Sequence, residues 1–153
     1  MANSHVSRRM GSISKNFSYS EFEASDTAKL YRIDNHITTF EVRDAVRALV
    51  LTVLQPLRSA WGAALVVSSG YRCPELNALV GGVPTSQHVK GEAADIKATR
   101  PLKLAQLAVD LGLPFDQMIL YPTFVHFSHK LEGEQRGQIL YNSSYKGRKV
   151  KQR

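Results

Sequence analysis

The sequence predicts an α+β domain, in which a small and mostly antiparallel sheet has helices packed on one side. Its 153 residues, 43% of them hydrophobic and 22% charged, are enough for one ordinary core and have the composition of a globular domain. Apolar residues recur at helical spacing over residues 40–61, and short β-rich segments separated by turn residues follow in the second half. These observations exclude a coiled coil, a collagen-like chain and a disordered chain.

Two segments, residues 40–61 and 101–111, show the apolar period of an amphipathic helix. The first is predicted to be the main core helix, and Pro56 is expected to kink or end it because proline lacks a backbone donor and its ring clashes with the preceding turn. Shorter helical turns are predicted within residues 17–28, where serines precede glutamates, and up to residue 79 after a Cys-Pro pair.

Five short segments are predicted to form strands: residues 63–69, 93–98, 117–121, 124–129 and 138–141. The Pro122-Thr123 pair between the third and fourth segments predicts a tight hairpin. The fifth segment is expected to add a third antiparallel strand to this hairpin.

The net charge of +7 lies in the two ends of the chain. Residues 1–9 hold two arginines and residues 146–153 hold five cations, whereas neither end holds an acid and the body between them is formally neutral. We therefore expect a flexible segment over residues 1–12, one domain over residues 13–145, and a basic, mobile and solvated tail over residues 146–153. The tail is expected to favour contact with an anionic polymer, and its charge alone does not select which polymer.

Several classes of protein are excluded by what the sequence lacks. Because no apolar run approaches the length of about 18 residues that a membrane span needs, we expect no span. The first residues contain no apolar signal region, so synthesis in the cytoplasm is expected. Cys73 is the only cysteine, which excludes an intramolecular disulfide and a cysteine-ligated zinc site. Any metal ion is then held by histidines and carboxylates.

The segment SQHVKGEAAD, residues 86–95, is the most informative stretch for chemistry. A loop that turns at Gly91 and continues into a strand can bring the imidazole of His88 and the carboxylate of Asp95 onto one ion. Both groups are of the kind that zinc accepts at about 2.0 to 2.2 Å.

Four motifs together resemble a known family. They are SGYR at residues 69–72, Asn77 followed by Gly81-Gly82, the pattern SxHxxGxAxD at residues 86–95, and FVHFS at residues 124–128. The sequence resembles the zinc D-Ala-D-Ala carboxypeptidases and L-Ala-D-Glu endopeptidases, whose fold is shared with the hedgehog signalling domain. The resemblance covers residues 17–141 and is greatest to the short, single-domain members of phages and their bacterial hosts.

The resemblance implies a zinc metallopeptidase that hydrolyses peptidoglycan stem peptides as a carboxypeptidase or an endopeptidase. It implies one zinc ion per chain, with His88, Asp95 and His126 as ligands and a water in the fourth position. It also implies that Arg72 binds a substrate carboxylate, for which a planar guanidinium is suited, and that Ser86 contributes to substrate binding. The expected setting is a monomer that acts at the cell wall after lysis, as an endolysin does, or as part of a virion.

His126 and His129 cannot both face one metal ion from the same strand, because an odd offset places them on opposite faces. If Pro122-Thr123 forms a two-residue turn, Ile119 pairs with His126, and Tyr121 lies diagonally beside His126 on the same face. His129 is then expected to point away, as an exposed residue at the strand end.

The sequence departs from the family in one respect. Members usually carry a glutamate or aspartate, acting as general base, a few residues before the last histidine ligand, whereas residues 120–125 contain no carboxylate. Asp116 and Glu92 are candidates for this base, and Tyr121 is a candidate donor to the developing oxyanion. The alternative function is a non-catalytic module, or a virion component, that binds zinc and cell wall and retains the peptidase fold. Specific nucleic-acid binding is not expected, because the neutral body has no platform of aromatic and basic residues.

Overall fold

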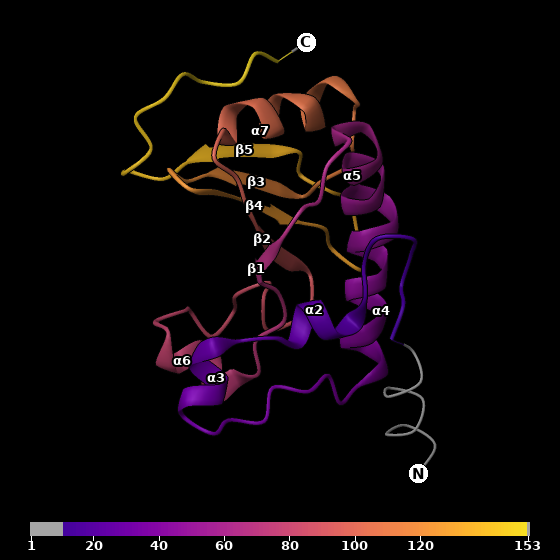
Figure 1. The fold of residues 1–153 in the computed structure, drawn as a ribbon, viewed down its shortest axis with the longest axis vertical. Coiled ribbons are helices and arrows are strands. Elements are labelled where there is room, and N and C mark those ends of the chain that lie inside the picture. Colours follow the sequence, from indigo (N-terminus) through magenta and orange to yellow (C-terminus); the bar gives the residue numbers. More distant parts are fainter. Residues whose placement is uncertain (1–10, 153) are drawn as a thin grey trace.

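A five-stranded sheet in the order β1-β2-β4-β3-β5 organises the computed structural model, which describes residues 11–152 (Figure 1). The strands are β1 (Val67–Ser69), β2 (Ala93–Lys97), β3 (Gln117–Leu120), β4 (Phe124–Ser128) and β5 (Gln138–Tyr141). The α+β class with a mostly antiparallel sheet is confirmed. β1 is shorter than the predicted segment 63–69, because the chain leaves the preceding helix through Gly62, at a φ of 79°, and residues 63 and 64 are still exposed.

The helices occupy two regions in Figure 1. The long helical run of α4 (Phe40–Leu49), η1 (Val50–Leu54) and α5 (Gln55–Trp61) lies beside the sheet, and α7 (Pro101–Asp110) packs against α5, β3 and β4. The short helices α2 (Tyr19–Glu23), α3 (Asp26–Leu30) and α6 (Pro74–Leu79) lie at the β1 end of the molecule. No helix within residues 11–152 combines the length and the apolar character that crossing a bilayer requires.

Pro56 neither ends nor breaks the helical run. The turn before it widens into the π-helix η1, in which the amide of Gln55 bonds to the carbonyl of Val50, and α5 continues beyond the proline. A wider turn accommodates a residue that has no amide hydrogen and whose ring crowds the preceding turn. The helix then ends at Gly62.

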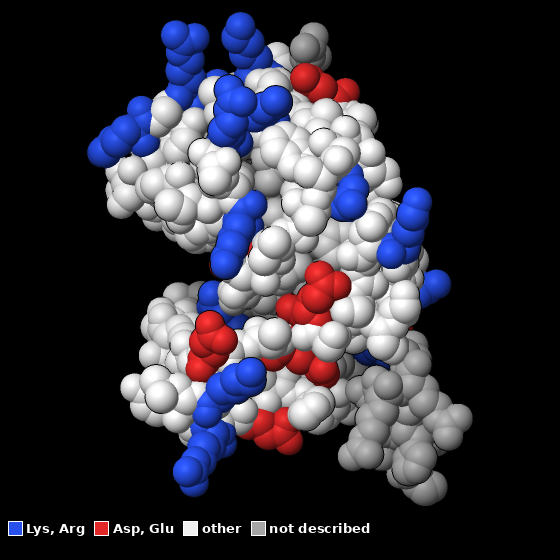
Figure 2. Space-filling view, in the orientation of Figure 1, with Lys and Arg blue, Asp and Glu red and all other residues white. Residues whose placement is uncertain are grey.

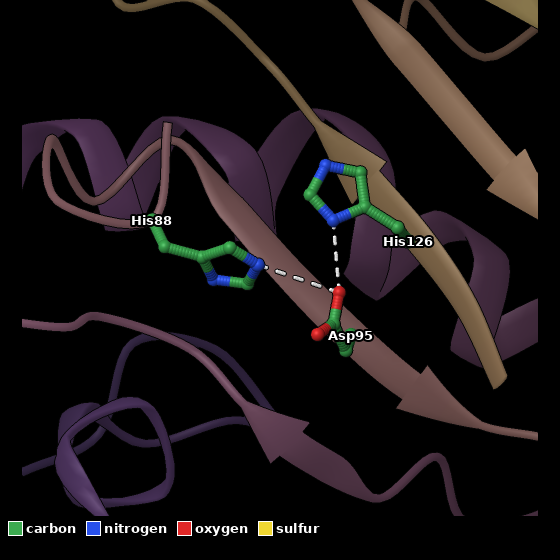
Figure 3. Close-up of side chains that lie close together, drawn as sticks. All are labelled: His88, Asp95 and His126. Atoms are coloured by element: carbon green, nitrogen blue, oxygen red, sulfur yellow. Dashed lines mark hydrogen bonds and ion pairs between the residues drawn. The ribbon is translucent and has the colours of Figure 1, made fainter. Parts of the chain in front are cut away.

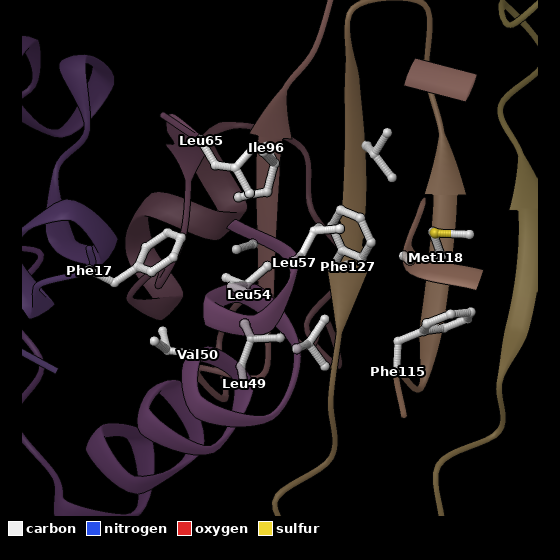
Figure 4. Close-up of a cluster of buried hydrophobic side chains, with 14 of the residues drawn as sticks. Phe17, Leu49, Val50, Leu54, Leu57, Leu65, Ile96, Phe115, Met118 and Phe127 are labelled. Carbon is white, nitrogen blue, oxygen red and sulfur yellow. The ribbon is translucent and has the colours of Figure 1, made fainter. Parts of the chain in front are cut away.

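The two faces of the sheet have different contents. Ile96, Val125 and Phe127 are fully buried, and their side chains pack with those of the helices in one core cluster (Figure 4). Side chains alternate between the faces of a strand, so Asp95 and His126, which neighbour these residues in sequence, project from the other face. Helices therefore pack on one side of the sheet, and the other side is available for a functional site.

The prediction of a third antiparallel strand is wrong, because β5 runs parallel to β3. β4 already pairs with β2 and β3, so the chain after β4 crosses to the free edge of β3. β5 therefore runs in the same direction as β3, and both of these strands run opposite to β4.

The expectation of a mobile, solvated tail is also wrong for the described part of residues 146–152. Val150 is buried in the core cluster, and its amide donates a hydrogen bond of 2.8 Å to the hydroxyl of Tyr141. Of the expected flexible segment, residues 1–10 lie outside the described part of the chain, and the amide of Tyr19 donates to the carbonyl of Gly11.

Candidate metal centre

His88, Asp95 and His126 converge on one point from three parts of the chain (Figure 3). His88 comes from the loop before β2, Asp95 from β2 and His126 from β4, where Asp95 and His126 are register partners. One potential ligand atom from each of the three lies within 4.8 Å of the other two. The Oδ1 atom of Asp95 is 2.8 Å from Nδ1 of His126 and 3.4 Å from Nε2 of His88.

The hydrogen bonding of His88 defines which of its nitrogens is available to a metal ion. Its Nδ1 lies 2.7 Å from the carbonyl oxygen of Gly70, and since a carbonyl only accepts, Nδ1 carries the hydrogen. In the neutral ring, Nε2 then directs a lone pair at the carboxylate of Asp95. Either a proton on Nε2 or a metal cation is therefore needed to hold these two groups together. A hydrogen bond from the other ring nitrogen to a carbonyl, like the one from His88 to Gly70, is also what orients histidine ligands in metal sites.

These residues fit a zinc ion. Two ligands of a tetrahedral zinc ion lie about 3.4 Å apart, which is the separation of His88 Nε2 from Asp95 Oδ1, whereas Nδ1 of His126 lies at hydrogen-bond distance from the same oxygen, 2.8 Å. Imidazole and carboxylate groups form an ordinary donor set for zinc, and three protein ligands leave one position for water or substrate.

The electrostatics keep the carboxylate of Asp95 ionised. Burial alone would raise the pKa of Asp95, but hydrogen bonding and coulombic attraction to His126 and His88 outweigh burial and hold this pKa well below its ordinary range. The Nη2 atom of Arg72 lies 3.9 Å from Oδ2 of the same carboxylate. The candidate centre therefore contains an ionised carboxylate with a cationic side chain beside it.

Arg72 is held in place by neighbours on both sides of its guanidinium. Its Nε donates to Oγ of Ser69 and its Nη1 to Oδ1 of Asn77, each at 3.2 Å. Its amide donates to the carbonyl of His88, which ties the SGYR segment to the metal loop. Burial lowers the pKa of Arg72, but the ordinary pKa of a guanidinium is so high that the side chain stays cationic. Sequence reasoning did not identify Ser69 and Asn77 as positioning residues, although both lie in the quoted motifs.

Ser86 braces the metal loop, because its Oγ accepts a hydrogen bond of 3.2 Å from the amide of His88. This contact accounts for a serine two residues before the histidine without reference to a substrate.

Tyr121 lies on the metal side of the sheet. Ile119 and His126 are register partners, as the two-residue turn predicted, and the ring of Tyr121 stacks on Phe124 with centroids 4.1 Å apart. Burial raises the pKa of Tyr121, the charge of Asp95 raises it further, and Arg72 opposes both. The phenol therefore keeps its proton at neutral pH and stands within electrostatic reach of the centre.

Asp116 and Glu92 belong to a different cluster, in which Gln87 donates to both carboxylates at 3.2 Å. Asp116 is fully buried and accepts three hydrogen bonds from Arg136, which hold its pKa at about 2. Glu92 accepts from Gln87 and, at 2.9 Å, from the amide of Leu131. Among the described residues, the hydrogen bonds of both carboxylates are made within this cluster and not with the metal centre.

His129 is half-buried, and the expectation of an exposed strand-end residue is wrong. Its amide donates to the carbonyl of Glu92, and its Nδ1 is buried with no hydrogen-bond partner among residues 11–152. Burial lowers the pKa of this histidine.

Comparison with known proteins identifies one family. The family described as Peptidase M15 matches residues 15–129, more than two thirds of the chain. The match includes residues 86–95, His126 in β4 and His129 just after it. No curated protein matches the chain.

Proposed function

Because the chain belongs to the peptidase M15 family, whose members are zinc-dependent, we propose that it is a zinc peptidase that hydrolyses peptidoglycan stem peptides. The observation that carries the proposal is the convergence of His88, Asp95 and His126, in which Nε2 of His88 is directed at the carboxylate of Asp95 at the spacing of two ligands of one ion. We further propose that His88, Asp95 and His126 are the three ligands of one zinc ion per chain.

Zinc, when bound, supplies a water of lowered pKa, about 7, and polarises a peptide carbonyl. The residues of the chain bind and orient the substrate around it. The guanidinium of Arg72, aligned by Ser69 and Asn77, binds a carboxylate of the stem peptide. The hydroxyl of Tyr121 donates a hydrogen bond to the carbonyl oxygen as negative charge develops on it. Ser86, whose hydroxyl braces the metal loop at His88, is proposed to contribute to substrate binding as well.

The biological setting that we propose is cell-wall hydrolysis at the end of a phage cycle, as an endolysin or a component of the virion. The support is the resemblance to short, single-domain members of this kind. The reaction products distinguish a carboxypeptidase, which removes a terminal D-alanine, from an endopeptidase, which cuts within the stem peptide.

A second candidate function is a module that binds zinc and cell wall without catalysis. The absence of a carboxylate from residues 120–125 favours it, as do the hydrogen bonds that Asp116 and Glu92 make elsewhere. A carboxylate with a pKa of about 2 is a weak base at neutral pH, which disfavours Asp116 in that role.

Mass spectrometry of purified stem peptides, incubated with the zinc-loaded protein, tests the activity. Loss of a terminal alanine identifies a carboxypeptidase, and two shorter peptides produced by a cut within the stem identify an endopeptidase. If the wild type binds zinc and leaves every stem peptide intact, the non-catalytic module is the correct function.

Elemental analysis of purified variants tests the ligands separately from activity. His88→Ala, Asp95→Ala and His126→Ala should each lose the zinc ion, whereas His129→Ala, the matched control on the same strand end, should retain it. Retention of zinc by His126→Ala with loss by His129→Ala would show that the ligand assignment is wrong.

Tyr121→Phe tests the oxyanion donor. Removal of one such donor lowers turnover by about a hundredfold to a thousandfold, and the zinc content should not change. Asp116→Asn and Glu92→Gln are the controls. If either control abolishes turnover with zinc bound, while Tyr121→Phe has wild-type activity, that carboxylate is the base and Tyr121 is not a catalytic residue.

A further inference from the structure

A groove lies away from the metal centre, where the C-terminal segment passes α7 and the end of α5. It is an open groove of about 760 Å³, and its rim carries Arg100, Lys103, Arg148, Lys149 and Lys151. We call it the basic groove. Figure 2 shows lysines and arginines gathered at this end of the molecule, near the C-terminus. α7 packs on the core face of the sheet, so the groove and the metal centre lie on opposite sides of it.

The backbone that carries the C-terminal cations is held against the domain. The side-chain amide of Gln106 donates to the carbonyl of Lys151 at 2.9 Å and accepts from the amide of Lys151 at 2.8 Å. Val150 is buried beside this pair, and the hydroxyl of Tyr145 donates to the carbonyl of Arg148. The backbone that carries these cations is thus fixed before a ligand binds, which lowers the conformational entropy that this segment loses on binding.

The charge of the groove is unbalanced. Among the described residues that line it there are five cations and one carboxylate, that of Asp110. Cations held close together repel one another, and an anionic ligand relieves this repulsion. The groove is therefore complementary to a polyanion.

The wall of the groove is apolar and contains one aromatic ring. Trp61 is half-buried, with the ammonium of Lys103 5.9 Å from its ring centroid, and Leu102 and Leu107 lie beside it. A flat indole next to a cation suits a sugar ring, whose C–H face packs on the indole while an attached anionic group pairs with the cation. Strands of nucleic acid are instead bound by several aromatic residues in succession, and Trp61 is the sole aromatic among the described lining residues.

We propose that the basic groove binds an anionic polysaccharide. One sugar ring packs against Trp61, and the anionic substituents of neighbouring sugars pair with Lys103, Arg148 and Lys149. Binding here is separate from peptide hydrolysis and serves to hold the protein on a surface rich in such a polymer.

Fluorescence of the intact protein tests the binding directly, because Trp61 is the only tryptophan in the chain. Dextran sulfate oligomers are the probe, with neutral dextran, inorganic polyphosphate and oligo(dT) of matched charge for comparison. Dextran sulfate should change the emission of Trp61, bind more tightly than polyphosphate and oligo(dT), and weaken as salt is raised. Tighter binding of oligo(dT) would overturn the proposal in favour of a nucleic-acid site, and absence of binding to dextran sulfate would overturn it outright.

Two triple variants with equal loss of charge separate a localised site from general attraction. The groove variant is Arg148→Gln, Lys149→Gln and Lys151→Gln, and the control variant replaces the exposed, remote Lys15, Lys29 and Lys90 by Gln. The groove variant should bind labelled dextran sulfate about tenfold more weakly and the control by less than about twofold. Equal weakening in the two variants would show that only net charge matters and would overturn the site.

Trp61→Ala tests the sugar contact, with binding followed by the anisotropy of the labelled probes. It should weaken dextran sulfate several-fold and leave polyphosphate unchanged, because polyphosphate has no ring to pack on the indole. An equal effect on both probes would refute recognition of a sugar.

Discussion

Replacement of Gly91 by alanine is expected to destabilise the fold and loosen the metal loop. Gly91 lies between His88 and β2 with a φ of +75°, and its amide donates to the carbonyl of His88. An added Cβ would lie 2.7 Å from the carbonyl oxygen of Val42 and 3.1 Å from Cγ2 of Val46. The loop thus meets the backbone of α4, which cannot rotate away as a side chain can.

The expected magnitude has two parts. An L-residue in the left-handed region costs about 1–2 kcal/mol. Overpacking against a well-ordered neighbour adds about 1–3 kcal/mol. The sum is about 3 kcal/mol, which for a chain of this size lowers Tm by roughly 6–12 °C.

Gly112→Ala is the matched control. Gly112 has a φ of +67°, and an added Cβ there meets nothing within 4 Å, so only the conformational part of the loss is expected. Urea denaturation of both variants measures the difference, and a zinc titration should show weaker binding for Gly91→Ala only. If the two substitutions lower the free energy of unfolding equally, the close approach of the metal loop to α4 does not contribute as argued.

Three further outcomes follow from single contacts. Arg136 holds the pKa of Asp116 at about 2 in the folded protein, below its ordinary value, so on acidification the unfolded chain takes up this proton first. Lowering the pH from about 4 to about 2 should therefore cost the wild type about 1 kcal/mol of stability, a loss that Arg136→Gln should not show. Urea denaturation at both pH values checks this, and equal losses would contradict it. Asn35→Ala should lower the free energy of unfolding by about 2 kcal/mol or more in thermal denaturation, because its side-chain amide bonds to three backbone groups in two segments, those of Glu23, Tyr71 and Cys73. A chelator should lower the Tm of the zinc-loaded wild type and leave that of Asp95→Ala unchanged, whereas equal shifts would mean that the metal binds elsewhere.

The helix and strand types followed from local periodicity, and most were predicted correctly. The hairpin register was predictable as well, because a two-residue turn leaves one pairing of Ile119 with His126. The direction of β5 was not, because alternation shows which side chains share a face but not which strand is the neighbour. The π-turn before Pro56 was missed for a similar reason, since a proline signals a disturbance but not its form.

The surroundings of the candidate site depend on contacts that no local pattern reveals. Arg136 lies twenty residues from Asp116 in sequence, and nothing in either segment indicates the ion pair. The same holds for Lys151 and Gln106, which are 45 residues apart and whose paired hydrogen bonds hold the segment expected to be free. Composition correctly located the charge at the end of the chain, but only the fold shows that this charge borders a groove.

The two proposals place different chemistry on opposite sides of one sheet. The metal centre projects from the face that carries Asp95 and His126, while the basic groove lies outside α7, which covers the core face. An anionic polysaccharide bound in the groove would therefore leave the metal face directed away from it. Since no described residue of the groove belongs to the metal centre, neutralising Lys149 and its neighbours should change where the protein is held and not how fast it cleaves a small soluble peptide.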